Sequence, residues 1–313
     1  MTSPLAVHLG PQTPDPVVRA VEGAGGRLVA VEEARAVVWV GDAASFTEAF
    51  GERGAGLPPT VEWVQLPSAG IESWFSAGIV DEDRVWTSAV GAYGSAVAEH
   101  AVALLLAGVR GLGRAARARS WDNGAAAEGQ VSLRGATVAV LGAGGIGALT
   151  IPVLNALGAR VIAVTRSGRE VPGAAECLPA AETTTIFERA DHVIVAAPAT
   201  AETAALVGAA ELAALGPQGW VVNIARGSLV DTEALVEALR DGRIGGAALD
   251  VTDPEPLPDG HPLWADPRVI ITPHSANPPS LQTPALAERI GENVRRFAAG
   301  EELLGRVDPG AGY

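Results

Sequence analysis

The sequence contains no lysine, because all 22 of its basic residues are arginine. This excludes Schiff-base chemistry, a pyridoxal-phosphate lysine and the lysine of a phosphate-binding P-loop. The single cysteine, Cys177, excludes an intrachain disulfide and a zinc cage built from cysteines, and no metal site is expected. Acid–base chemistry must therefore use histidine, carboxylates, tyrosine or cysteine.

Positive charge is also scarce, and the formal net charge is −14. Nucleic acids and anionic membrane surfaces attract basic proteins, so neither is an expected partner. The longest apolar run, residues 101–109, is too short to span a bilayer, and the N-terminus does not read as a signal peptide. We therefore expect a cytoplasmic protein, and 313 residues suffice for two ordinary domains.

The chain is organised around an apolar run at residues 137–141 that leads into a G-x-G-x-x-G motif. A helix-like pattern and a second apolar run follow, which is the context of a dinucleotide-binding turn. In such a turn Gly142 permits the sharp bend, Gly144 admits a pyrophosphate, and Gly147 lets the helix approach the sheet. The alternative is a glycine-rich turn without a ligand. The expected cofactor contacts in this motif are Gly142, Gly144, Gly145, Ile146 and Gly147.

The end of the second strand bears on the choice of nicotinamide cofactor. An NAD site usually has an acidic residue about 20 positions after the first glycine, whereas this chain has Thr165, Arg166 and Ser167. Arg166 can stack on adenine or pair with a 2′-phosphate, and the two hydroxyls can add hydrogen bonds. The pattern favours NADP over NAD. The alternative is a solvated Arg166, with NAD bound through other contacts.

Strand-like and helix-like segments alternate along the chain, which predicts parallel sheets covered by helices on both faces. One long helix is expected over residues 94–120, with its first half buried and with Glu99 and His100 in structural roles. The expected strands before this helix are residues 5–10, 27–31, 36–40, 61–67 and 84–90. Those after the glycine motif begin near residues 190, 219, 244 and 268.

Three residues near strand ends suggest the chemistry: Arg226, Glu255 and His274. An arginine fork fits a carboxylate, and a histidine beside a glutamate is stabilised as imidazolium, so it can donate a proton. With a hydride donor, these groups would suffice to reduce a 2-keto acid. Each residue alone also fits a structural role, and the sequence pattern does not show that the three meet.

The sequence resembles the D-isomer-specific 2-hydroxyacid dehydrogenases from about residue 60 to the C-terminus. The resemblance rests on "VAEHAVALLLA", "LRGATVAVLGAGGIG", "VVNIARGSLVDTEALVEALRDGRIGGAALDV", "EPLP", "HPLW" and "VIITPHSA". It implies an α/β fold of two doubly wound parallel-sheet domains. In that fold a Rossmann nucleotide-binding domain, residues 96–276, is inserted into a flavodoxin-like substrate domain, residues 1–95 and 277–313.

The resemblance also implies roles for individual residues. Arg226 matches the arginine that binds the substrate carboxylate and polarises the carbonyl, His274 the general acid/base, and Glu255 the acid that pairs with it. Such proteins are usually homodimers, and Trp121 is the candidate to reach a neighbouring subunit's site. The implied substrate-carboxylate loop is Ser68, Ala69, Gly70 and Ile71. The further implied cofactor contacts are Ala197, Pro198, Thr203, Ile224, Ala225, Asp250 and Ala276.

These features predict an enzyme that reduces a small 2-keto acid, such as glyoxylate or hydroxypyruvate, to the D-2-hydroxy acid. NADP is the preferred cofactor and NAD the second choice, and His274 supplies the proton. Two alternatives stay open. One is an NAD-dependent oxidation of a D-2-hydroxy acid, and the other is a dinucleotide-sensing binding protein of the corepressor type.

Overall fold

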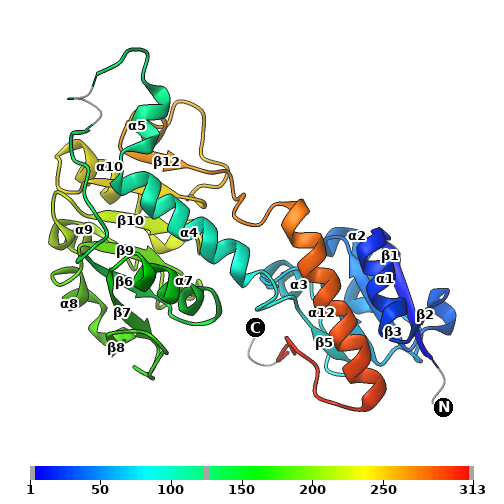
Figure 1. Ribbon diagram of the computed structural model, residues 1–313. Helices are drawn as coiled ribbons and strands as arrows, with labels where there is room; N and C mark the ends of the chain where they lie inside the picture. The colour runs from blue at the N-terminus through cyan, green and yellow to red at the C-terminus, as the bar shows by residue number, and fades with distance from the viewer. Residues whose placement is uncertain (1–3, 123, 125–126, 310–313) are drawn as a thin grey trace. The chain divides into compact units, whose positions relative to one another are not determined.

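The computed structural model describes residues 4–122, 124 and 127–309, which form two compact units (Figure 1). Unit 1 comprises Met1–Tyr93 and Pro278–Tyr313, and unit 2 comprises Gly94–Asn277. Each unit has one sheet whose paired strands are all parallel. The predicted fold class, two doubly wound α/β domains, is confirmed. No helix in the described part of the chain is long and apolar enough to cross a membrane.

Unit 2 has a seven-stranded sheet in the order β12-β11-β10-β9-β6-β7-β8. The chain runs outward from β6 to β8 and then crosses to β9 on the other side of β6. The loops after β6 and β9 therefore separate at a topological switch point, where open α/β sheets bind ligands. The strands are β6 (Thr137–Leu141), β7 (Arg160–Thr165), β8 (Glu176–Pro179), β9 (His192–Val195), β10 (Trp220–Asn223), β11 (Gly246–Leu249) and β12 (Val269–Ile271).

Helices cover both faces of this sheet, and this explains why its strands are apolar at successive positions. Along β6, Val138 and Val140 pack with α4 (Gly94–Val109) and α7 (Gly145–Ala156), and α4 crosses in front of the strands in Figure 1. Ala139 and Leu141 face the other way. That second face is covered by α8 (Thr183–Phe187), α9 (Ala209–Leu215), α10 (Thr232–Arg240) and α11 (Pro262–Ala265).

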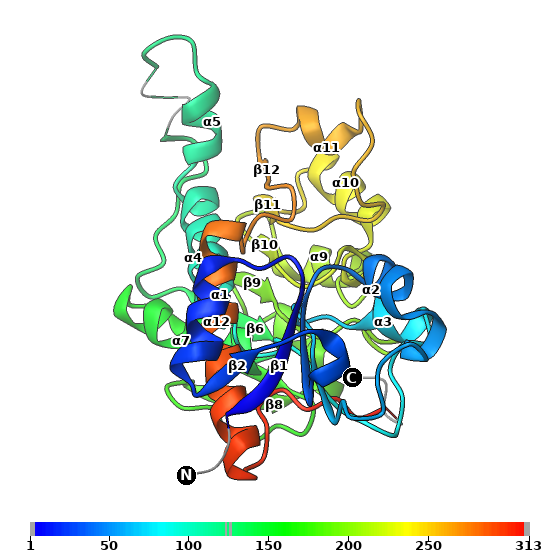
Figure 2. The same cartoon turned by 90° about the vertical axis from the view of Figure 1, so that its right-hand side faces the viewer.

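Unit 1 has a five-stranded sheet in the order β2-β1-β3-β4-β5, the flavodoxin-like order. One face packs against α1 (Asp15–Gly23) and α12 (Pro279–Ala299), which lie side by side (Figure 2). The other face packs against α2 (Ala43–Phe50) and α3 (Glu72–Ser76). The chain thus returns after unit 2 to complete unit 1. The strands are β1 (Leu5–Pro11), β2 (Gly26–Leu28), β3 (Ala36–Val40), β4 (Trp63–Gln65) and β5 (Val85–Thr87).

Some local details differ from the prediction. The helix expected over residues 94–120 is interrupted, because Gly111 adopts a left-handed conformation (φ 62°) and a separate helix, α5 (Leu112–Arg117), follows it. The strand expected over residues 27–31 ends at Leu28. The half-buried edge strand β8 was not predicted. Short 3₁₀ turns are η1 (Val31–Glu33), η2 (Glu52–Gly54), η3 (Ala180–Glu182) and η4 (Gly227–Leu229).

Candidate active site

Close contacts require glycine at two positions of the turn between β6 and α7. Gly142 has φ 89°, and a Cβ atom there would lie 2.4 Å from the backbone of Ala197. A Cβ atom at Gly147 would lie 2.4 Å from the carbonyl oxygen of Gly142. These contacts bring α7 directly against the end of β6 and beside the loop after β9. The motif therefore has the steric basis that its sequence predicts.

The middle of the same turn is open. A Cβ atom at Gly144 or Gly145 would meet nothing within 4 Å among the described residues. Helix α7 begins at Gly145, so the first N–H groups of its N-terminus have no partner within the helix. An open backbone surface beside a helix N-terminus fits a pyrophosphate.

The end of β7 supplies a second feature that fits a dinucleotide. Thr165 is only 8% exposed, and its Oγ1 atom has no hydrogen-bond partner among the described residues. A buried hydroxyl without a partner is unusual in a folded chain. Arg166 and Ser167, which follow it, are exposed. A ribose or 2′-phosphate placed here would meet one orphaned hydroxyl and one cation.

The loop after β9 lies near Arg166. The pKa of the Glu202 carboxyl is lowered, first by a hydrogen bond from Thr200 and to a lesser degree by the charge of Arg166. Thr203 closes this loop, since its Oγ1 atom donates to the Pro198 carbonyl at 2.7 Å and accepts from the Thr200 N–H at 2.8 Å. The hydroxyl predicted to lie beside the cofactor is thus bonded to its own loop. Of the other positions expected near the cofactor, Ala197, Ile224 and Ala276 are buried and Ala225 is half-buried.

Asn223, at the end of β10, holds the loop that carries Arg226. It is fully buried, and its Oδ1 atom accepts from the Ala225 N–H at 3.0 Å. Its Nδ2 atom donates to the Arg226 carbonyl at 2.8 Å. The guanidinium of Arg226 is half-buried and donates to the Ala225 carbonyl at 2.8 Å. Asn223 was not among the predicted site residues, although an amide that ends an otherwise apolar strand was a usable signal.

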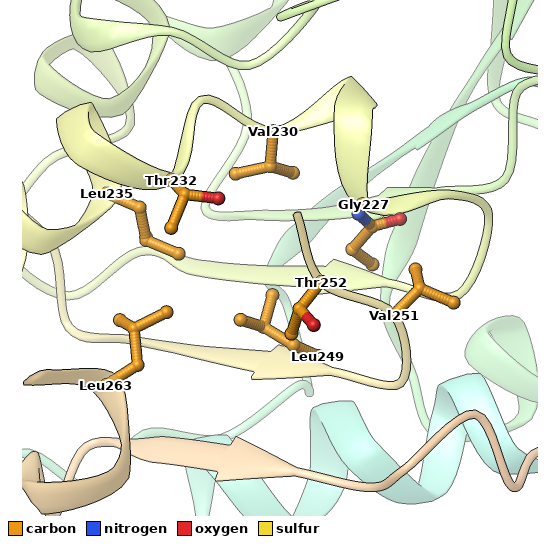
Figure 3. A pocket seen from close by; sticks show the side chains of 9 residues that line it. Gly227, Val230, Thr232, Leu235, Leu249, Val251, Thr252 and Leu263 are labelled. Atoms are coloured by element: carbon orange, nitrogen blue, oxygen red, sulfur yellow. The ribbon is translucent and has the colours of Figure 1, made fainter. Parts of the chain in front are cut away.

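At Gly227 the loop that carries Arg226 packs against the loop that leads toward Glu255. A Cβ atom at Gly227 would lie 1.9 Å from the carbonyl oxygen of Thr252, so only glycine fits between the two loops. Figure 3 shows both residues at the edge of a small pocket. Its other lining is mainly apolar, and Leu235 and Leu249 are examples. This pocket belongs to the packing of α10 against β11.

His274 and Glu255 form the predicted pair. The Nδ1 atom of His274 lies 2.6 Å from Oε1 of Glu255, and both side chains are about half exposed. An ionised carboxylate can accept hydrogen bonds but cannot donate them, so the hydrogen in this pair is on Nδ1 of His274. Nε2 is then the nitrogen available to a substrate.

The backbone at His274 is held by Asp250. His274 has φ 49°, a left-handed conformation that is costly for a residue with a side chain. Its N–H donates to the Asp250 carbonyl at 2.8 Å. The carboxylate of the buried Asp250 accepts from the N–H groups of Ser275 at 2.9 Å and Ala276 at 3.2 Å. Asp250 thus anchors the segment that follows β12.

Arg226, Glu255 and His274 follow β10, β11 and β12, which are neighbours in one parallel sheet. The carboxyl ends of these strands share an edge, so the sheet brings the three residues to one region of unit 2. Among the three, the contact that the structure establishes is the one between His274 and Glu255. In the described part of the chain, no group of three or more His, Cys, Asp or Glu side chains could hold a metal ion.

The predicted substrate loop belongs to unit 1. The Ser68 hydroxyl accepts from Trp74 Nε1 at 3.2 Å, and the Ser68 carbonyl accepts from the Ala89 N–H at 2.8 Å. The N–H groups of Ala69 and Gly70 make no hydrogen bond within the described chain. The loop is therefore fixed at Ser68 and offers two donors after it. Trp121, in unit 2, is 93% exposed.

These two units, one of which has a dinucleotide-type glycine turn, define a dehydrogenase-like α/β protein. The family model described as "D-isomer specific 2-hydroxyacid dehydrogenase, NAD binding domain" matches residues 85–276. The chain belongs to this family, and therefore to the NAD(P)-dependent oxidoreductases that act on a CH–OH group.

Two relatives have the same identity to this chain but match different shares of its length. A protein of Corynebacterium melassecola described as uncharacterized is 38% identical over 296 residues, which cover 94% of this chain and 95% of that protein. A glyoxylate/hydroxypyruvate reductase A of Klebsiella pneumoniae subsp. pneumoniae is 38% identical over 178 residues. This second match covers 56% of each protein, so the chain matches just over half the length of that curated reductase.

Solved structures resemble the chain over its whole length. A D-isomer specific 2-hydroxyacid dehydrogenase from Xanthobacter autotrophicus, in complex with NADPH and MES, has a TM-score of 0.79 and 27% identity. An NADPH-dependent glyoxylate/hydroxypyruvate reductase from Sinorhizobium meliloti, in complex with NADP and sulfate, has a TM-score of 0.77 and 26% identity. Each comparison covers 99% of this chain and 100% of the solved chain.

Proposed function

We propose that this protein reduces a small 2-keto acid, of the glyoxylate or hydroxypyruvate type, to the D-2-hydroxy acid with NADPH. The observation that carries the proposal is the His274–Glu255 pair, with 2.6 Å between Nδ1 and Oε1, on the strand edge that also bears Arg226. A proton donor on the same sheet edge as an arginine suits a substrate that has a carboxylate next to a carbonyl. The relatives described as glyoxylate/hydroxypyruvate reductases support the same substrate class.

A bound nicotinamide would supply the hydride to the keto carbon, and the chain's own residues do the rest. Arg226 binds the substrate carboxylate and polarises the carbonyl, because its fork offers donors to both groups. His274, protonated and held by Glu255, gives the proton on Nε2 to the carbonyl oxygen. Glu255 limits the rotation of the ring and balances its charge.

NADP is the proposed cofactor, and NAD is the second choice. The turn at Gly144 and Gly145 is open where a pyrophosphate would lie, and the orphaned Thr165 hydroxyl faces no protein partner. Arg166 is exposed and can pair with a 2′-phosphate. The solved relatives that hold NADPH or NADP support this choice.

A homodimer is proposed as well. The 93% exposed indole of Trp121 supports it, because tryptophan is enriched in protein–protein interfaces. Sedimentation analysis tests it, and a chain that stays monomeric at micromolar concentration would refute it.

The reaction is tested by following the loss of NADPH or NADH absorbance with glyoxylate, hydroxypyruvate, pyruvate and phenylpyruvate. Faster consumption of NADPH with one of the smaller acids supports the proposal. Consumption of NADH alone would refute the cofactor assignment but keep the reaction. Tight cofactor binding without consumption with any acid would refute the proposed reaction.

A further inference from the structure

Helix α4 places a histidine beside the buried carboxylate that anchors the His274 segment. The Nε2 atom of His100 lies 2.9 Å from Oγ1 of Thr272 and 3.4 Å from Oδ1 of Asp250. All three residues belong to unit 2. The Asp250 side chain is 2% exposed and that of His100 is 23% exposed, so the contact is largely shielded from water.

The available hydrogen atoms decide which residue donates in the His100–Thr272 hydrogen bond. Thr272 Oγ1 lies 2.6 Å from Asp250 Oδ1, and the carboxylate can only accept, so the threonine hydroxyl donates its one hydrogen there. The bond from His100 must then be donated by the ring, which means that Nε2 carries a hydrogen. The three side chains form a directed chain, His100 to Thr272 to Asp250. Hydrogen bonds linked in this way strengthen one another in a shielded site.

The series of hydrogen bonds from His100 ends at Asp250, which holds the backbone of the segment that contains His274. Asp250 accepts from the Ser275 and Ala276 N–H groups with its carboxylate, and from the His274 N–H with its carbonyl. His274 has a left-handed backbone (φ 49°), which persists only when neighbouring contacts enforce it. The orientation of the Asp250 carboxylate therefore helps to set the direction of the His274 side chain.

We propose that His100 is a positioning residue for His274, acting through Thr272 and Asp250. A threonine hydroxyl rotates to suit its partners. With His100 present, only the orientation that donates to Asp250 satisfies both contacts. Without it, Thr272 can donate elsewhere and the carboxylate loses a fixed partner. The proposal rests on the proposed reduction, in which His274 supplies the proton.

Steady-state kinetics on His100→Leu, His100→Gln, Thr272→Val and the double variant His100→Leu/Thr272→Val test this. His100→Leu should lower kcat by about 3–10-fold, the effect of losing one shielded hydrogen bond, with the KM for the keto acid changed less than about twofold. His100→Gln keeps an N–H donor and should restore kcat to within about twofold of wild type. Glu99→Gln, on an exposed neighbour in the same helix, is the control.

The double variant tests whether His100 acts through Thr272. If it does, His100→Leu/Thr272→Val should be no slower than Thr272→Val alone, because the second change removes an interaction already lost. Losses that multiply would overturn the proposal. So would a lowered melting temperature in His100→Leu with unchanged kcat, or a His100→Gln variant as slow as His100→Leu.

Amide hydrogen exchange of the segment around Ser275 and Ala276 gives a readout that needs no turnover. Exchange there should be about tenfold faster in His100→Leu and Thr272→Val than in wild type and Glu99→Gln. Unchanged exchange would overturn the proposal. A wild-type protein that consumes no NADPH, yet shows this exchange pattern, would refute the proposed reaction and leave the His100 contact supported.

Discussion

His192 makes the stability of this protein sensitive to acid. It begins β9 in the middle of the seven-stranded sheet, is 2% exposed, and its Nδ1 atom has no hydrogen-bond partner among the described residues. Burial lowers the pKa of His192 to about 4, against a smaller opposing effect of Asp191. The unfolded chain takes up a proton near pH 6.5. The folded chain takes it up only near pH 4, so unfolding binds a proton between these values.

This difference in pKa sets the direction and the size of the change in the free energy of unfolding with pH. The stabilising contribution is fully present above about pH 6.5 and is lost as the pH falls toward 4. Between about pH 7.5 and pH 5 the loss is about 2 kcal/mol, since each unit of pKa difference corresponds to about 1.4 kcal/mol. His192→Leu removes the titrating ring and fills similar space. Its free energy of unfolding should therefore fall by about 2 kcal/mol less than that of wild type over this range.

The measurement is urea unfolding of both proteins at the two pH values, followed by circular dichroism. Groups that titrate in both chains cancel when the two pH differences are compared. A second reporter is tryptophan fluorescence, to which Trp220, the partner of His192 in the sheet, contributes with the six other tryptophans. Equal pH-dependent losses in wild type and His192→Leu would refute the reasoning, because His192 would then not titrate differently in the folded chain.

Four further predictions concern the proposed site. His274→Ala should lower kcat by roughly 10²–10⁴-fold, the usual contribution of a general acid, and near-normal kcat would contradict its role. Arg166→Ala should weaken NADPH binding by about tenfold and leave NADH binding unchanged; equal losses for both cofactors, measured by titration, would contradict the 2′-phosphate contact. Gly144→Ala should weaken NADPH binding without lowering the melting temperature, because its Cβ atom would point into open space. Gly227→Ala should destabilise the protein by about 1–3 kcal/mol in urea unfolding, because its Cβ atom would meet the Thr252 carbonyl; wild-type stability would show that the two loops can separate.

Much of the fold was predictable because burial imposes local patterns. The apolar runs of β6 and β7 are buried on both faces, and the glycine motif between them follows from steric contacts that any such turn has. Less regular segments were missed. The half-buried strand β8 has little apolar pattern, and the break at Gly111 falls in a segment whose composition also fits a continuous helix.

The sequence pattern by itself determined that the sheets are parallel and covered by helices, and it determined which residue types are available for catalysis, because both depend on composition and short-range pattern. The family resemblance implied the His274–Glu255 pair, but the sequence pattern did not show it, and the tertiary structure decided which of those residues meet. The contact between His100 and Thr272 joins positions 172 residues apart, and the His274–Glu255 pair joins loops that follow different strands. Asn223 holds the Arg226 loop from inside the sheet. Such contacts depend on the order of strands in the sheet, which brings loop ends together irrespective of their separation along the chain.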